Sequence, residues 1–280
     1  MALGVHLECR YHRLRAGKNN TVKIIVKGRD SHLISAGEDN LIWQTALRIA
    51  REVGQPLLPI ELEIDNAIPL GKGLGSSAAA LTAGIVIADD LLKLRWPKSR
   101  VLDEAARLEG HPDNVAACVL GSIVASATDS LGVTHAVKME LHNRFALAVV
   151  VPDFTLPTVE SRRVLPTSYS KADAIFNIQR STLLITALAT GAADAFPTAL
   201  EDRMHQPYRA ALVPGLAEII KLRTKGLLGC ALSGAGPSIL VFYERGYQNV
   251  CHAVQRIFAK HGKDSEVIVA ELSTCGYEFV

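Results

Sequence analysis

Alternation of apolar and polar positions predicts a half-buried strand at residues 59–65. Ile60, Leu62 and Ile64 fall on one face, and acidic residues between them fall on the other. Such a strand suits an antiparallel or mixed sheet, because the strands of a covered parallel sheet are apolar on both faces. Further strands are expected at residues 21–27, 144–151, 238–243 and 266–272.

Apolar residues at helical spacing predict helices between these strands. The segments expected to be helical are residues 39–52, 76–94 and 248–260, and one that begins at Pro214. Strands and helices mix without a strict βαβ alternation, which favours the α+β class. Pro152 and Pro157 follow a predicted strand, so a boundary is expected near residues 141–157. The sequence therefore predicts two α+β halves, 1–143 and 144–280.

The composition argues against several classes of function. The 280 residues include 30 Lys+Arg and 28 Asp+Glu, and 5% are aromatic. The near-neutral charge and the few aromatic residues give no reason to expect a nucleic-acid or anionic-membrane partner. The five cysteines form no CxxC pair, no signal-peptide pattern opens the chain, and the longest apolar run is too short to span a bilayer. These features predict a soluble cytoplasmic protein.

A glycine-rich segment carries the clearest candidate chemistry. From Pro69 to Ala80 the chain reads Pro-Leu-Gly-Lys-Gly-Leu-Gly-Ser-Ser-Ala-Ala-Ala, between a predicted strand and a predicted helix. The glycines allow amide groups to approach a ligand closely, and Ser76 and Ser77 begin a helix, where N–H groups and the dipole favour an anion. These properties describe a phosphate cradle, although the spacing is neither a Walker loop nor a dinucleotide fingerprint. The alternative is a strand-to-helix turn with an ordinary serine cap.

A second motif, Glu-Gly-His-Pro-Asp-Asn, begins at Glu109 and precedes an apolar helix. Asp113 could cap that helix, with its charge at the positive end of the dipole. The sharper interpretation is a carboxylate that holds Mg²⁺ beside phosphates, because hard cations take oxygen ligands. Glu109 would supply this carboxylate, together with Ser77.

The two motifs resemble those of the GHMP kinases. Pro-x-x-x-Gly-Leu-Gly-Ser-Ser-Ala-Ala is similar to the loop that wraps the ATP phosphates in that superfamily, and Glu-x-His-Pro-Asp-Asn resembles its homoserine kinases. The resemblance implies a ribosomal-protein-S5-like α+β half that binds ATP, residues 1–143, and a ferredoxin-like α+β half, residues 144–280. It also implies ATP- and Mg²⁺-dependent phosphorylation of L-homoserine to O-phospho-L-homoserine in threonine biosynthesis, by a homodimer.

The resemblance further implies a role for each residue that matches a family motif. Residues expected to bind ATP are Pro69, Leu70, Gly71, Lys72, Gly73, Leu74, Gly75, Ser76, Ser77, Ala78 and Ala79, with Asn40 as an additional candidate. Ser77 and Glu109 are expected to hold Mg²⁺. Residues expected to bind the substrate are His111, Asp113, Thr158, Arg162, Arg209 and Gly234.

The catalytic assignment follows from one difference within the superfamily. Mevalonate-type kinases place a catalytic Asp where this sequence has Asn114, so the resemblance implies no side-chain general base at that position. Catalysis would then rest on positioning and charge neutralisation, which suits phosphoryl transfer. The residues assigned to catalysis are Glu109, Asn114 and Arg162.

The start of the chain departs from the family pattern. The family's first motif, Pro-x-Ser-x-Asn-x-Gly-x-Gly-Phe-Asp, has no counterpart, because Leu3-Gly4 already matches the residues that follow it. A start codon assigned too late, a real truncation and a loss of catalysis are the three explanations, and we expect this form to be marginally stable and weak at turnover. The alternatives for function are a GHMP kinase for another small alcohol and a nucleotide-binding protein with little turnover.

Overall fold

The computed structural model describes residues 1–14 and 22–280, which form two compact units. Unit 1 consists of Met1–Leu70, Gly75–Met139 and Leu272–Val280, and unit 2 consists of Gly71–Leu74 and Glu140–Glu271. The expected boundary between residues 143 and 144 lies close to the one between Met139 and Glu140, and two short segments belong to the other unit. Gly71–Leu74 of the glycine segment belong to unit 2, and the C-terminal segment Leu272–Val280 belongs to unit 1.

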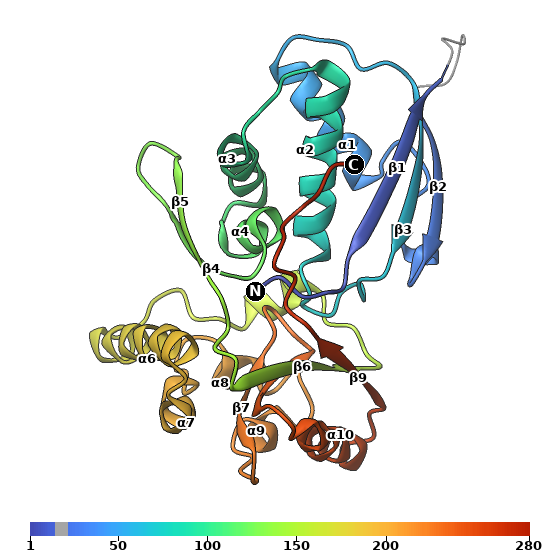
Figure 1. Cartoon of the computed structure of the whole chain (residues 1–280). Helices are drawn as coiled ribbons and strands as arrows, with labels where there is room; N and C mark the ends of the chain where they lie inside the picture. The colour runs from blue at the N-terminus through green and yellow to red at the C-terminus, as the bar shows by residue number, and fades with distance from the viewer. Residues whose placement is uncertain (15–21) are drawn as a thin grey trace. The chain divides into compact units, whose positions relative to one another are not determined.

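Unit 1 contains a three-stranded mixed sheet in the order β1-β3-β2 (Figure 1). The central strand pairs antiparallel with β1 and parallel with β2. Its residues Ile60, Leu62 and Ile64 are fully buried, as the alternation predicted. The strands are β1 (Leu7–Arg13), β2 (Val22–Gly28) and β3 (Ile60–Asn66). The strand expected at 21–27 is therefore confirmed, with residue 21 outside the described residues.

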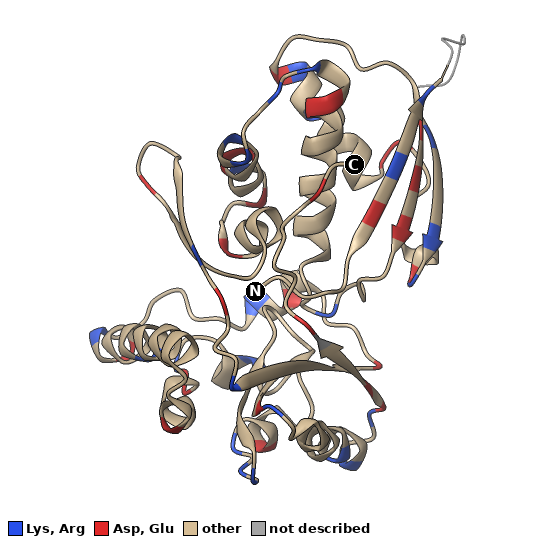
Figure 2. Ribbon diagram, viewed as in Figure 1, with Lys and Arg blue, Asp and Glu red and all other residues tan. Residues whose placement is uncertain are grey.

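The outer face of this sheet is polar. Figure 2 shows charged residues on all three strands: basic residues on β2, acidic residues on β3 and both kinds on β1. Lys23 Nζ lies 2.5 Å from Glu61 Oε2, and Lys27 Nζ lies 2.7 Å from Glu63 Oε1. Opposite charges on neighbouring strands stabilise the sheet modestly, because both side chains remain in contact with solvent.

The buried face of the sheet and the helices of unit 1 share one apolar core. The helices are α1 (Leu41–Glu52), α2 (Ser76–Leu92), α3 (Lys98–Glu109) and α4 (Asp113–Leu120). The chain also forms a short 3₁₀ turn, η1 (Ser31–Leu33), and a separate hairpin, β4 (Ile123–Thr128) and β5 (Thr134–Met139). Helices were predicted at 39–52 and 76–94, and the structure confirms both with small differences at their ends.

The C-terminal segment Leu272–Val280 packs on α4 and the residues that follow it. Ser122 N–H donates to Ser273 O at 2.6 Å, and Tyr277 N–H donates to Cys118 O at 2.9 Å. A Cβ on Gly276 would lie 1.9 Å from Val119 O, so the two main chains are in direct contact. Residues 272–280 therefore belong to unit 1 through main-chain contacts.

Unit 2 contains a four-stranded antiparallel sheet in the order β7-β8-β6-β9. The strands are β6 (Phe145–Pro152), β7 (Leu227–Leu232), β8 (Ile239–Glu244) and β9 (Ser265–Ala270). The helices are α5 (Thr158–Arg163), α6 (Lys171–Thr190), α7 (Phe196–Ala199), α8 (Gln206–Arg209), α9 (Leu216–Ile219) and α10 (Cys251–Lys260), with 3₁₀ turns η2 (Ala193–Ala195) and η3 (Gln248–Val250). The predicted strands of this half and the helix near 248–260 are confirmed.

A helix is present near Pro214, but the prediction of its start and length was wrong. Helix α9 has only four residues, and its N-cap is Gly215 in a left-handed conformation. Pro214 therefore precedes the cap, and the apolar residues beyond Ile219 lie outside the helix. The α+β class itself is confirmed in both units. No helix among residues 1–14 and 22–280 is long and apolar enough to cross a membrane.

Candidate functional site

The glycine segment adopts a conformation that requires its glycines. Gly71, Gly73 and Gly75 have φ values of 65°, 74° and 76°. A Cβ on Gly73 would lie 2.1 Å from Ser233 O, whereas a Cβ on Gly75 would meet nothing within 4 Å. Ser233 Oγ also donates to Gly73 O at 2.8 Å. Gly73 therefore allows close packing against the 233–238 loop of unit 2, and Gly75 leaves open space beside the main chain.

Lys72 anchors the same segment to the end of β6. Its ammonium donates to Pro152 O at 2.8 Å and to Phe154 O at 2.7 Å, and the residue is 8% exposed. Leu156 N–H donates to Gly71 O at 3.3 Å. The side chain of Lys72 thus holds the loop in place. In an anion site, Lys72 would therefore contribute its main-chain N–H group rather than its ammonium group.

Helix α2 begins without a side-chain cap. Its N-cap is Gly75, so the expected alternative of an ordinary serine cap is wrong. The N–H groups of Ser76, Ser77 and Ala78 make no hydrogen bond to the described residues. Three donors without an acceptor among the described residues, at the positive end of a 17-residue helix, are suited to bind an anion.

Two residues outside the sequence motifs, Asp30 and Asn66, fix the start of this loop. Asp30 Oδ2 accepts from Leu70 N–H at 2.9 Å. Asn66 is 2% exposed, and its Nδ2 donates to Arg29 O at 2.8 Å and to Ile68 O at 2.9 Å. Asn66 was detectable, because it continues the buried face of an alternating strand where an apolar residue is expected.

Ser77 and Glu109 meet in unit 1. Ser77 Oγ in the first turn of α2 donates to Glu109 Oε2 at 3.0 Å. Glu109 is the last residue of α3, which ends at Gly110 in a left-handed conformation. The structure therefore brings together the two residues that the resemblance assigned to Mg²⁺.

The donor set at Ser77 and Glu109 fits Mg²⁺. A hydroxyl and a carboxylate are hard oxygen ligands, and Mg²⁺ is commonly held by one or two protein oxygens plus substrate phosphates and water. No cluster of three or more His, Cys, Asp or Glu side chains suited to a metal exists among the described residues. A site of this kind would therefore depend on the phosphates for most of its ligands.

The rest of the second motif lies at the start of α4. Asp113 is the first helical residue, after the N-cap Pro112, and makes no side-chain cap, so the capping interpretation is wrong. Its Oδ1 contacts Nδ1 of His111 instead. Asp113 and Asn114 are exposed to solvent. A carboxylate near the positive end of a helix and open to solvent is suited to bind a small cationic group.

Asn40 caps helix α1. Its Oδ1 accepts from Ile42 N–H at 3.0 Å and Trp43 N–H at 3.4 Å, and its Nδ2 donates to Ser35 O at 2.7 Å. The residue is 2% exposed. The side chain of Asn40 therefore serves the helix, and its expected contact with a nucleotide stays a prediction.

Arg209 connects three segments of unit 2. Its Nε donates to Ser161 O at 3.1 Å, its Nη1 donates to Gly234 O at 3.1 Å, and Nη1 also lies 3.1 Å from His205 Nδ1. The residue is 8% exposed. Nη2 makes no hydrogen bond to the described residues, so one edge of the guanidinium remains for a ligand.

The surroundings of Arg209 are electropositive. Burial lowers the pKa of Arg209, and the charge of Arg162 lowers it further, while Asp202 opposes both effects. Thr158 and Arg162 lie exposed on α5, and Gly234 lies exposed in the 233–238 loop. Two positive charges that interact in one region of unit 2 favour an anionic ligand.

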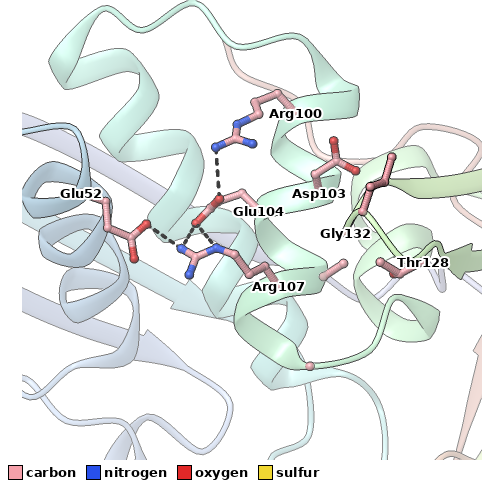
Figure 3. A pocket seen from close by; sticks show the side chains of 10 residues that line it. Glu52, Arg100, Asp103, Glu104, Arg107, Thr128 and Gly132 are labelled. Atoms are coloured by element: carbon pink, nitrogen blue, oxygen red, sulfur yellow. Dashed lines mark hydrogen bonds and ion pairs between the residues drawn. The ribbon is translucent and has the colours of Figure 1, made fainter.

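A hollow of about 440 Å³ lies elsewhere in unit 1 (Figure 3). Most of its charged groups are paired: Arg107 Nη2 lies 2.5 Å from Glu52 Oε2 and also contacts the buried carboxylate of Glu104, which Arg100 reaches at 3.5 Å. The lining residues are Glu52, Arg100, Asp103, Glu104, Ala106, Arg107, Gly110, Thr128, Leu131 and Gly132. None of the residues expected to be functional lines this hollow.

Comparison with known proteins decides the family. The GHMP kinases N terminal domain matches residues 40–122, and the GHMP kinases C terminal domain matches residues 184–260. The chain is 62% identical over 278 residues to the homoserine kinase of Solibacter usitatus, which covers 99% of this chain and 90% of the relative. The chain belongs to the homoserine kinase family.

Two more comparisons agree with membership of the homoserine kinase family. The homoserine kinase of Deinococcus radiodurans is 38% identical over 269 residues, or 95% of this chain and 87% of the relative. The crystal structure of homoserine kinase from Cytophaga hutchinsonii has a TM-score of 0.79 at 24% identity and covers 96% of this chain and 86% of that one. The relatives confirm the family inferred from the motifs, and the crystal structure confirms the GHMP kinase fold.

Proposed function

We propose that this chain transfers the γ-phosphoryl group of ATP to the side-chain hydroxyl of L-homoserine, which gives ADP and O-phospho-L-homoserine. The observation that carries the proposal is the open N-terminus of α2 with Glu109 beside Ser77, in a chain of the homoserine kinase family. In the transfer, the homoserine oxygen forms a bond to γ-phosphorus as the bond to the β,γ-bridging oxygen breaks. The hydroxyl proton leaves to solvent or to a phosphate oxygen.

The ATP phosphates are assigned to the glycine segment and the first turn of α2. The N–H groups of Ser76, Ser77 and Ala78 donate to phosphate oxygens, and Gly75 leaves room for them. Bound Mg²⁺ supplies charge neutralisation at the transferring group. Ser77 and Glu109 supply protein oxygens to that ion.

The homoserine zwitterion is assigned to groups of opposite charge. Nη2 of Arg209 donates to the carboxylate, because a guanidinium edge matches its geometry. In unit 1, the contact of His111 with Asp113 leaves an exposed carboxylate that suits an ammonium group, and the role that the resemblance implies for Asp113 stays a prediction. Thr158 and Arg162 contribute a hydroxyl and a positive charge. Asn114 cannot act as a base, so the chain catalyses by alignment and electrostatics.

Measuring homoserine-dependent ADP release tests the proposal. Glu109→Gln is expected to abolish ADP formation while ATP binding, measured by calorimetry, persists. Release of ADP with another small alcohol and none with homoserine would favour a different GHMP kinase. ATP binding without any alcohol-dependent release would favour a nucleotide-binding protein.

We further propose a cytoplasmic role in threonine biosynthesis, where O-phospho-L-homoserine would be the product passed on. All five cysteines are free thiols, which agrees with a reducing compartment. Isotope-labelled homoserine in cells with and without the chain tests the role. Labelled threonine that is independent of the chain would contradict it.

We also propose that two copies associate through α6. Ile175, Ile178 and Ile185 are exposed on this helix at spacings of three and seven residues, which places them on one face, as in a helix-pairing seam. The charged side chains Asp173 and Arg180 are engaged with other residues of unit 2. In an antiparallel pair, Lys171 at the start of one copy would meet the carbonyl groups at the end of the other helix, which favours a second copy of this chain.

Sedimentation analysis tests this association. Ile178→Asp is expected to convert a dimer into a monomer, whereas Leu131→Asp, at an exposed apolar position in unit 1, leaves the mass unchanged. A wild-type chain that is monomeric at micromolar concentration, or a dimer that tolerates Ile178→Asp, would contradict the proposal.

A further inference from the structure

The carboxylate of Asp202 accepts four hydrogen bonds in unit 2, although its side chain is only 6% exposed. Oδ2 accepts from the N–H groups of His205 at 2.8 Å and Gln206 at 2.6 Å. Oδ1 accepts from Met204 N–H at 2.9 Å and from Asn177 Nδ2 on α6 at 2.6 Å. Asp202 therefore fixes the first turn of α8 and ties it to α6.

Two side chains on α8, those of Gln206 and Arg209, connect this helix to the segments that contain the expected substrate residues. Gln206 Oε1 accepts from Leu232 N–H at 2.9 Å, at the end of β7 and directly before the 233–238 loop. Arg209 reaches the carbonyl groups of Ser161 on α5 and Gly234 in that loop. A rotation of α8 would therefore move Arg209 relative to both segments.

The charge of Asp202 also compensates the buried guanidinium. Burial by itself would raise the pKa of Asp202, but hydrogen bonds from Gln206 N–H and Asn177, together with the effect of His205, outweigh burial and hold that pKa below its ordinary value. Asp202 is therefore an anion at neutral pH. Its charge opposes the loss of positive charge that burial favours at Arg209.

We propose that Asp202 is a positioning residue for substrate recognition, which holds α8 so that Nη2 of Arg209 meets the carboxylate of the amino-acid substrate. The inference rests on the proposed function, because it takes the homoserine carboxylate as the ligand of Arg209. Asp202 touches neither substrate nor ATP and acts through α8. Removing its charge should therefore weaken recognition of the carboxylate and leave the transfer step itself nearly intact.

The test compares two alcohols in ATP-dependent ADP release. L-Homoserine carries the carboxylate, whereas 3-aminopropan-1-ol keeps the hydroxyl and the amine but lacks it. The variant is Asp202→Asn, which keeps the size of the side chain but replaces one acceptor oxygen by a donor. The matched control is Glu201→Gln, because this neighbouring carboxylate is exposed and pairs with Arg180 at 3.0 Å.

Asp202→Asn is expected to raise the KM for homoserine by about 10- to 100-fold, because small misplacements of a binding group have effects of this size. The kcat for homoserine and the KM for ATP should change little. Discrimination between the two alcohols, measured as the ratio of their kcat/KM values, should fall by a similar factor. Glu201→Gln should alter none of these quantities.

Other outcomes of this comparison contradict either the positioning role of Asp202 or the proposed function. An equal loss of kcat/KM for both alcohols, or a change no larger than that of Glu201→Gln, overturns the positioning role alone. A wild-type chain without homoserine-dependent ADP release overturns the proposed function and this inference with it. If Asp202→Asn does not fold by circular dichroism, Asn177→Ala decides, because it removes one of the four hydrogen bonds. Asn177→Ala should reduce the discrimination between the two alcohols, but less than is expected for Asp202→Asn. Unchanged discrimination in Asn177→Ala would contradict the inference.

Discussion

Ser77 Oγ and Glu109 Oε2 lie 3.0 Å apart in unit 1, where the first turn of α2 meets the end of α3. The hydrogen bond orients the carboxylate toward the open N-terminus of α2, where three N–H groups have no protein acceptor among the described residues. One hydroxyl therefore lies beside both the proposed phosphate donors and the proposed metal ligand.

Ser77→Ala should lower kcat by about 10- to 100-fold and raise the Mg²⁺ concentration needed for half-maximal rate, because it removes an oxygen ligand and the orienting partner of Glu109. A magnesium titration of the ADP-release assay measures both effects. Ser99→Ala is the control, since Ser99 occupies the same position in the first turn of α3. Equal magnesium dependence in both variants would contradict the assignment.

Gly73→Ala should destabilise the chain by about 1–3 kcal/mol and raise the KM for ATP, because the residue has a positive φ and its new Cβ would strike Ser233 O. Gly132→Ala separates the two causes. Gly132 has φ 82° with nothing within 4 Å, so this variant carries only the conformational penalty. Chemical denaturation and ATP kinetics check the prediction, and equal effects of the two variants would exclude the steric clash.

Asn66→Ala should lower the free energy of unfolding by about 1–3 kcal/mol, because it leaves buried main-chain groups of Arg29 and Ile68 without partners. It should also raise the KM for ATP, since the start of the glycine segment loses its support. Asp65→Asn, on the solvent face of the same strand, serves as the comparison. Denaturation curves that coincide for the two variants would show that Asn66 is dispensable.

The stability of the chain should decrease as the pH falls from 7 toward 5.5, with His205 as one contributor. Burial lowers the pKa of His205, Arg209 lowers it further, and Asp202 partly opposes both. Between this folded-state pKa and about 6.5, the unfolded chain binds more protons, so stability is lost as pH falls. His205→Gln should flatten the dependence of Tm on pH in this window. An unchanged slope would assign it to other groups.

Elements with a regular local pattern were predictable from the sequence. The alternation at Ile60, Leu62 and Ile64 predicted β3, and the alanine-rich run after Ser76 predicted α2. The strand β1 was missed, because alternating charges in a short edge strand resemble a polar loop until its antiparallel partner is known. The β4–β5 hairpin was missed for a similar reason, since its pairing is not encoded in either short segment alone.

The candidate site also has a part that was predictable from the sequence and a part that was not. The motifs located Ser77, Glu109 and Arg209 by residue number. The contacts of Arg209 with Ser161 and Gly234 join residues 48 and 25 positions apart, and no local pattern indicates such contacts. Asp202 was overlooked because a single acidic residue beside Glu201 looks like an ordinary surface charge. The capping roles of Asn40 and Gly75 likewise depended on backbone conformation.

The C-terminal segment Leu272–Val280 has a consequence for biosynthesis. These residues are translated after all of unit 2, yet their main chain contacts Cys118, Val119 and Ser122 of unit 1. Unit 1 therefore acquires its final contacts only after all of unit 2 has been translated, although domains commonly complete folding in chain order. A bulky fusion placed directly at Val280 would disturb unit 1 rather than the unit that precedes it in sequence.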